Sequence, residues 1–136
     1  MSSINRPLTA PNLTFDLTSQ LAELRQEEAY HRSGRAGRTL AKSGRMRVTL
    51  VAMTRGNVIG THQADSPLTL HVLEGHIRFR AGGEDHELQA GQLLFFGPGD
   101  AHDLTATEES ALLLTLSAIG DDFGGGEDEK RGLLLG

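Results

Sequence analysis

Hydrophobic and polar residues alternate in a series of short runs between residues 46 and 117. Successive side chains of a β-strand point to opposite faces, so an alternation of period two predicts strands with one apolar face. Glycine, proline, asparagine and aspartate residues separate the runs and predict turns. The expected strands are 46–53, 68–73, 77–80, 86–88, 93–96, 102–105 and 111–117. Short strands at this spacing, without helices between them, predict an all-β sandwich or barrel and argue against a parallel α/β fold.

The first 45 residues follow a different pattern. The run Thr14 to Leu17 predicts a short strand, and apolar residues at helical spacing between Gln20 and Arg32 predict a helix. Thr18 or Ser19 is placed to cap the N-terminus of this helix, and Ser33-Gly34 is placed to end it. The chain is therefore expected to add a short N-terminal helix to the barrel.

These patterns divide the chain into three parts. Residues 1–36 are expected to form an arm and a short helix, and residues 37–119 the β-barrel. Residues 120–136 are expected to form a flexible, acidic, glycine-rich tail. The run Leu133-Leu134-Leu135 is an apolar exception in this tail, and it either docks on the domain or a neighbour or is disordered with the rest.

Length and composition exclude several kinds of chemistry. A chain of 136 residues suits one domain, which buries roughly two-thirds of the surface that its unfolded chain exposes. The chain has no cysteine, so disulfides, thiolate metal sites and cysteine nucleophiles are excluded. The polar N-terminus does not have the pattern of a signal peptide, and no run reaches the ~18 apolar residues of a membrane span. We expect a cytoplasmic protein with no membrane partner.

The formal net charge of −5 is distributed unevenly. Acidic residues are concentrated in the tail, whereas the segment from Arg32 to Arg55 carries basic residues and no acidic ones. We interpret these cations as lining solvated strand edges and turns, where they discourage edge-to-edge pairing. The segment has no aromatic residue on which bases would stack, so nucleic acid is not expected as a partner. A phosphorylated or carboxylate ligand stays open.

Two short segments carry glycine and histidine at characteristic spacings. The residues concerned are Gly60, His62 and Gly75 in the first segment and Gly91, Gly99 and His102 in the second. With these residues the chain resembles the cupin superfamily over residues 40–117, specifically the small single-domain cupins, although Pro98 lies one place later than the family proline. The resemblance implies a cupin-type double-stranded β-helix, or jelly-roll, barrel.

The family's metal ligands are only half present. In the enzymes that the chain resembles, two histidines, a glutamate and a further histidine hold a metal ion. The second histidine position is Ala64 here and the glutamate position is Leu68, so His62 and His102 are left. A catalytic metal needs at least three protein ligands. Neighbouring side chains are poor replacements because they face away or lie on exposed turns; they are Gln63, Asp65, His71, His76 and His86.

Three functions are compatible with this pattern. The first is a metal-free or weakly metal-binding module that binds or senses a small molecule, with no cofactor expected. Its pocket is expected to be lined by His62, Leu68, Leu70, Val72, Phe95 and His102. The second is a metal-dependent oxygenase or isomerase in which His62 and His102 bind Fe, Mn, Ni or Zn. The third is a structural homodimer, because the resemblance implies pairing through sheet faces or exchanged N-terminal strands.

Overall fold

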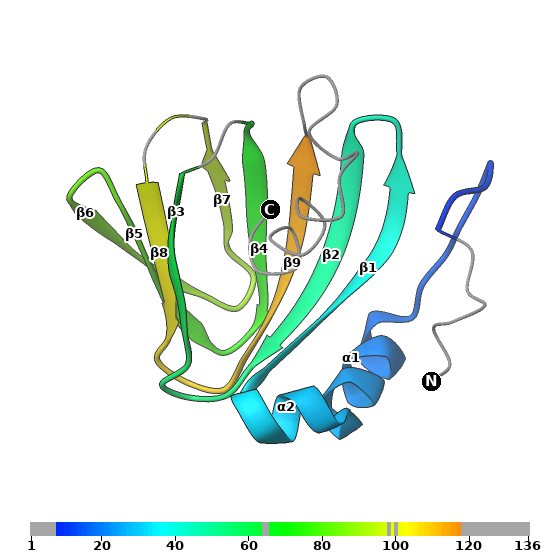
Figure 1. The fold of residues 1–136 in the computed structure, drawn as a ribbon, viewed down its shortest axis with the longest axis horizontal. Coiled ribbons are helices and arrows are strands. Elements are labelled where there is room, and N and C mark those ends of the chain that lie inside the picture. Colours follow the sequence, from blue (N-terminus) through cyan, green and yellow to red (C-terminus); the bar gives the residue numbers. More distant parts are fainter. Residues whose placement is uncertain (1–7, 64–65, 98, 100, 118–136) are drawn as a thin grey trace.

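Two antiparallel sheets face each other and make up most of the molecule (Figure 1). The computed structural model describes residues 8–63, 66–97, 99 and 101–117. One sheet has the strand order β1-β2-β9-β4-β7 and the other has the order β3-β8-β5-β6. The elements are α1 (Leu17–Gln26), α2 (Glu28–Ser33), β1 (Arg35–Ser43), β2 (Met46–Met53), β3 (Val58–Gln63), β4 (Leu68–Glu74), β5 (His76–Ala81), β6 (Glu84–Gln89), β7 (Leu93–Phe96), β8 (Ala101–Ala106) and β9 (Ser110–Ser117). The predicted all-β barrel with a short helical N-terminus is confirmed.

The hydrophobic residues form two cores, one on each side of the five-stranded sheet. The barrel core lies between the two sheets and contains inward-facing residues such as Val51, Phe79 and Leu112. The second core lies on the outer side of β1 and β2, where Leu21 and Leu24 of α1 pack against the sheet. Strands β1 and β2 are therefore covered on both faces, because the helices occupy the face that the barrel does not use (Figure 1).

The helical segment differs from the expectation in its start and its continuity. Asp16, not Thr18 or Ser19, caps α1, and its carboxylate accepts a hydrogen bond from the Ser19 amide at 3.3 Å. The expected strand from Thr14 is absent from the described residues, because the helix already begins at Leu17. Helix α2 ends, as predicted, at Gly34, whose φ of 82° is a left-handed conformation that glycine adopts without strain.

Strand β1 was not expected from the alternation of the sequence. Its burial does not follow a period of two, because Thr39, Leu40 and their neighbours are covered from both sides. A register shift between Thr39 and Ala41 also marks a bulge against β2. A strand buried on both faces and interrupted by a bulge has no simple alternation, so its pattern cannot be recognised locally.

The two ends of the barrel differ. At one end, which we call the hairpin end, lie the β1–β2 turn and the connections from β3 to β4 and from β7 to β8. At the other end, Gly75 (φ 87°) turns the chain from β4 into β5.

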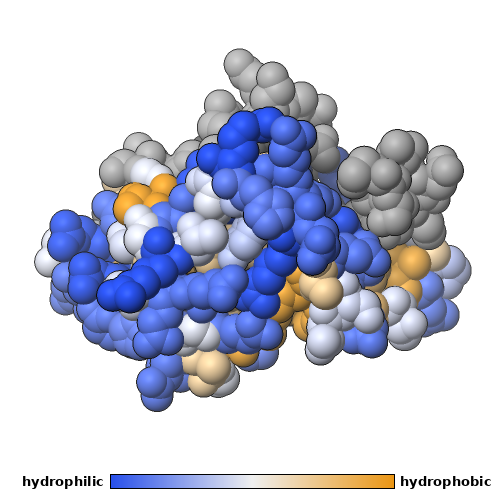
Figure 2. Space-filling view, turned by 90° about the horizontal axis from the view of Figure 1, so that it is seen from below, coloured by the Kyte–Doolittle hydropathy of each residue, from blue (hydrophilic) through white to orange (hydrophobic). Residues whose placement is uncertain are grey.

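The surface seen from below is mainly hydrophilic, with small hydrophobic patches (Figure 2). Helices α1 and α2 are both too short to span a bilayer.

Candidate functional site

The inner wall of the five-stranded sheet carries a cation at the hairpin end. Arg47 of β2 pairs with Leu116 of β9, which pairs with Leu68 of β4, which in turn pairs with Phe96 of β7. These residues form one row across the sheet, and the Arg47 side chain is 0 % exposed. Removing a guanidinium from water costs several kcal/mol unless anionic or polar groups compensate it. The Arg47 position is therefore chemically distinctive within a mainly aliphatic wall.

A buried histidine lies on the opposite sheet at the same end. His102 of β8 is 2 % exposed and pairs with Ala81 of β5. Its ring stacks on Phe79, with the ring centroids 5.2 Å apart and the planes inclined by 22°. Phe96 meets the His102 ring edge-on, also at a centroid distance of 5.2 Å. Because Phe96 belongs to the Arg47 row, this aromatic cluster joins the two walls of the barrel.

A buried hydroxyl completes the set of polar groups inside the barrel. Thr49 lies two residues after Arg47 on the same face of β2, pairs with Leu114, and is 0 % exposed. Its Oγ1 atom has no hydrogen-bond partner among the residues that the structure describes. A buried hydroxyl left in this state costs about 1–3 kcal/mol. Residues that carry such a cost are candidates for function, because packing alone would favour valine at this position.

The structure brings most of the expected pocket residues to the barrel interior. Leu68, Leu70 and Val72 of β4 all belong to the barrel core, and His102 lies against its aromatic part. The backbone register places His62 of β3 directly opposite His102 of β8. The side chain of His62 lies outside the described part of the structure, as does Ala64.

Phe95 is placed differently from the expectation. It is 69 % exposed on the outer side of β7, and its neighbour Phe96 faces inward instead. The run Leu93 to Phe96 is apolar at every position, so its sequence does not indicate which residues face the core. The register with β4 determines that Phe96 faces the core, because Phe96 lies opposite Leu68 and both side chains point into the barrel.

The sequence analysis did not assign the interior positions of Arg47, Thr49 and Phe79. The strand alternation could have indicated these positions, because each of the three residues lies an even number of positions from a barrel-core residue of its own strand. The alternation of β2 separates an apolar face, with Leu50 and Ala52, from a mixed face, with Arg47 and Thr49, but it does not say which face the barrel uses. The helices take the apolar face into the second core, so the mixed face of β2 lines the barrel.

The described residues contain no group of three or more histidine, aspartate or glutamate side chains that could hold a metal ion. Leu68, at the family's glutamate position, is buried against the apolar wall. His76 contacts Thr107, with 2.6 Å between Nδ1 and Oγ1, and His86 lies 3.8 Å from a Glu84 carboxylate oxygen. His62 and His102 are thus the only imidazoles that the backbone register brings together among the described strands, and two ligands are fewer than a catalytic metal needs.

The sequence analysis placed the cations between Arg32 and Arg55 on solvated strand edges and turns, but Arg38 and Arg47 are buried. Arg38 of β1 is 5 % exposed, and its guanidinium contacts the carboxylates of Glu23 and Glu27 at 2.7 and 2.9 Å. Burial lowers the pKa of Arg38, but the hydrogen bonds to both carboxylates outweigh it and leave the pKa raised. Arg38 therefore fastens α1 to the sheet, and Arg47 is the second exception because it is buried inside the barrel.

Comparisons with known proteins agree with this architecture. The family model described as "Cupin domain" matches residues 49–117. A conserved protein of unknown function from Streptococcus pyogenes is 22 % identical with a TM-score of 0.67, over 84 % of this chain and 94 % of that chain. No curated protein sequence matches this chain.

Two further solved structures share the fold at lower sequence identity. Salicylate 1,2-dioxygenase from Pseudoaminobacter salicylatoxidans is 14 % identical with a TM-score of 0.71, over 86 % of this chain and 38 % of that chain. A protein described as a predicted oxalate decarboxylase from Thermotoga maritima is 18 % identical with a TM-score of 0.57, over 62 % of this chain and 81 % of that chain. At these identities the similarity shows the fold, which confirms the predicted jelly-roll barrel.

Proposed function

The chain belongs to the cupin domain family, and we propose that its barrel binds a small organic carboxylate as a metal-free or weakly metal-binding ligand-binding module. The observation that carries the proposal is Arg47, a fully buried cation on the inner wall. A guanidinium presents its N–H donors in a planar fork that matches the two oxygens of a carboxylate. Ligand sites in barrels combine a mainly apolar wall with a few polar groups that orient the ligand.

The surroundings of Arg47 suggest how such a ligand would be oriented. The Thr49 hydroxyl, two residues along β2, is a further donor for a carboxylate oxygen. The rings of Phe79 and Phe96, which contact His102, offer apolar surface to the body of the ligand. Salicylate and oxalate, which the descriptions of the dioxygenase and of the predicted oxalate decarboxylase name, are carboxylates as well, which is in keeping with this ligand class on the same fold.

Thermal unfolding with paired ligands tests the proposal. Salicylate and oxalate are compared with their uncharged amides, salicylamide and oxamide, in the wild-type protein and in Arg47→Met, which keeps much of the side-chain volume without the charge. A ligand at 100 times its Kd stabilises the native state by about 2.7 kcal/mol. We expect at least one carboxylate to raise the Tm, no amide to do so, and Arg47→Met to lose about 10- to 150-fold in affinity.

Arg78→Met is the matched control, because Arg78 lies on the outer face of β5 and pairs with Glu87 at 2.9 Å. It should keep the wild-type response to the carboxylates. Equal Tm shifts for a carboxylate and its amide would contradict the proposal, as would full binding by Arg47→Met.

The alternative, a metal-dependent enzyme, rests on the register that places His62 opposite His102. Protein purified without an affinity tag is incubated with Fe, Mn, Ni or Zn salts, dialysed and analysed for bound metal. A stoichiometric metal that disappears in His102→Ala would favour the enzyme over the metal-free module. A bound-metal content of less than one ion per several protein chains, unchanged in His102→Ala, would count against the enzyme.

The third candidate, a homodimer, rests on exposed apolar residues of the edge strand β7. Leu93 and Phe95 are 63 % and 69 % exposed on the outer side of the five-stranded sheet. Large apolar side chains next to each other at a sheet edge are typical of interfaces. Light scattering of the wild type and of Phe95→Ser tests this: a dimer that dissociates on substitution supports the interface, and a wild-type mass of 14.6 kDa excludes it.

A further inference from the structure

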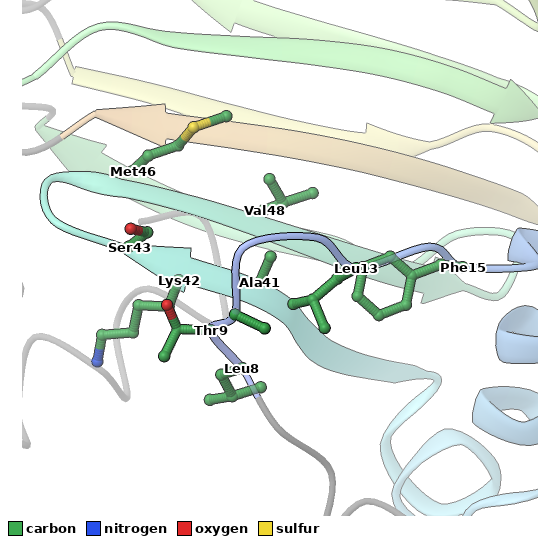
Figure 3. A pocket seen from close by; sticks show the side chains of 10 residues that line it. Leu8, Thr9, Leu13, Phe15, Ala41, Lys42, Ser43, Met46 and Val48 are labelled. Atoms are coloured by element: carbon green, nitrogen blue, oxygen red, sulfur yellow. The ribbon is translucent and has the colours of Figure 1, made fainter.

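A cavity lies outside the barrel, between the N-terminal arm and the outer face of the β1–β2 hairpin (Figure 3). Its volume is about 330 Å³, near the lower end of the range of roughly 300–1,000 Å³ for small-molecule sites. Leu8, Leu13 and Phe15 of the arm line one side, and Ala41, Met46 and Val48 of the hairpin line the other. We call this space the arm pocket.

The arm pocket is a continuation of the second core. Phe15 and Val48, which line it, also pack against that core. The Lys42 amide donates a hydrogen bond of 2.8 Å to the Leu8 carbonyl, which holds the arm beside the strand while leaving space beneath it. Met46 at the rim is 52 % exposed. The pocket is therefore an apolar surface that the described residues leave partly open.

The chain leaves β9 close to this pocket and carries an apolar segment further on. Strand β9 ends at Ser117, whose backbone partner is Met46. The chain continues to Leu133, Leu134 and Leu135, which we call the leucine segment. The connecting residues 118–132 can span up to about 50 Å, so the leucine segment can reach the pocket from the strand end.

Charge favours the same placement. The connecting residues carry five acidic side chains and two basic ones. The hairpin turn beside the pocket carries Lys42 and the exposed Arg45. The Lys42 amine extends away from the apolar lining, at the edge of the pocket (Figure 3). An acidic connection would therefore pass a basic rim, an attraction that salt weakens.

We propose that the leucine segment of the same chain occupies the arm pocket and completes the second core. Its side chains then contact Met46 and Val48, and the acidic connection lies along the basic turn. Tethering gives the segment an effective concentration on the order of millimolar, so a modest preference for the pocket keeps it occupied.

Because the chain has no cysteine, a disulfide between two introduced cysteines reports on this contact. Ser43→Cys, at the pocket rim, is combined with Gly132→Cys, next to the leucine segment. The control pairs Gly132→Cys with Glu84→Cys, an exposed position at the hairpin end of the other sheet. Oxidation is followed in dilute solution by intact mass and by gel mobility.

We expect the Ser43–Gly132 pair to form an intramolecular disulfide about tenfold faster than the control pair, and substitution of all three leucines by serine to abolish that advantage. Equal rates for the two pairs would overturn the proposal. An advantage that survives the serine substitutions would also overturn it, because charge alone would then bring the tail to the hairpin. A mainly intermolecular disulfide would overturn it by assigning the pocket to the tail of a second copy.

Dye binding tests, without introduced cysteines, whether the leucine segment covers the arm pocket. The full-length triple serine variant should bind an environment-sensitive apolar dye such as anilinonaphthalene sulfonate more strongly than the wild type, because its pocket is open. The enhancement should be lost when Ala41→Phe fills the pocket. Equal dye binding by the wild type and the serine variant would show that the leucine segment does not cover the pocket.

Discussion

Replacing Thr49 by valine tests whether the barrel interior keeps a polar group at the expense of stability. The Oγ1 atom is buried and has no hydrogen-bond partner among the described residues, a state that costs about 1–3 kcal/mol. Valine keeps the branched shape and removes the hydroxyl. We expect the free energy of unfolding to rise by about 1–2 kcal/mol and the Tm by roughly 3–10 °C.

The assay is urea unfolding followed by far-UV circular dichroism, because the chain has no tryptophan. Thr115→Val is the matched control: Thr115 lies half-buried on β9, on the opposite face from the barrel core residue Leu114, and its change should stay within about 0.5 kcal/mol. A loss of about 1 kcal/mol or more in Thr49→Val would refute the reasoning, because it would mean that the hydroxyl is already well satisfied.

The same variant also tests the proposed ligand. If the hydroxyl donates to a bound carboxylate, Thr49→Val should bind that carboxylate about 5- to 10-fold more weakly while it unfolds at a higher temperature. Opposite signs for stability and affinity are expected of a residue that is retained for binding. A variant that is more stable and binds equally well would remove Thr49 from the site.

Three further outcomes follow from contacts outside the barrel. Arg38→Ala should lower the free energy of unfolding by about 2 kcal/mol in urea, between the values for exposed and buried ion pairs, because its two carboxylate partners are partly exposed. Gly75→Ala should cost about 3 kcal/mol or more, because φ is 87° and a Cβ would meet the Glu109 carbonyl and the Ser110 hydroxyl. Tyr30, the only tyrosine, has a pKa raised by burial and by its hydrogen bond to Glu109. Its ultraviolet titration should therefore lie at a higher pH than that of free tyrosine, and Glu109→Gln should lower its pKa. The stability that Tyr30 contributes is present below its unfolded pKa and is lost as the pH rises through its folded pKa, which a pH series of melting curves measures.

Local sequence patterns were sufficient to predict most strands of the barrel. Alternation placed β2, β4, β5, β8 and β9 within a residue or two, and the continuous apolar run 93–96 predicted β7 with its observed bounds. Gly34 ended the helix for the expected reason, its left-handed φ. These features depend on neighbours in the chain, because strand alternation and backbone conformation are set by adjacent residues. Strand β1 was missed because both of its faces are covered by distant segments.

The interior of the barrel depended on contacts between distant residues. Met46 and Arg47 are adjacent, yet one is half-exposed beside the arm and the other is buried inside the barrel. Alternation separates such neighbours onto two faces, but it does not say which face a helix will cover. At β2 the helices cover the more hydrophobic face, and Arg47 and Thr49 are buried on the face that points into the barrel.

The sequence by itself therefore determined the strand alternation, the turns and the two family-like segments, with His62 and His102 in them. Only the tertiary structure decided that these histidines lie opposite each other in the backbone register, that Phe96 rather than Phe95 faces inward, and that Arg47 lies within the wall. The physical reason is that local sequence sets the period of a strand, whereas pairing with distant strands and coverage by the helices set its phase and its burial.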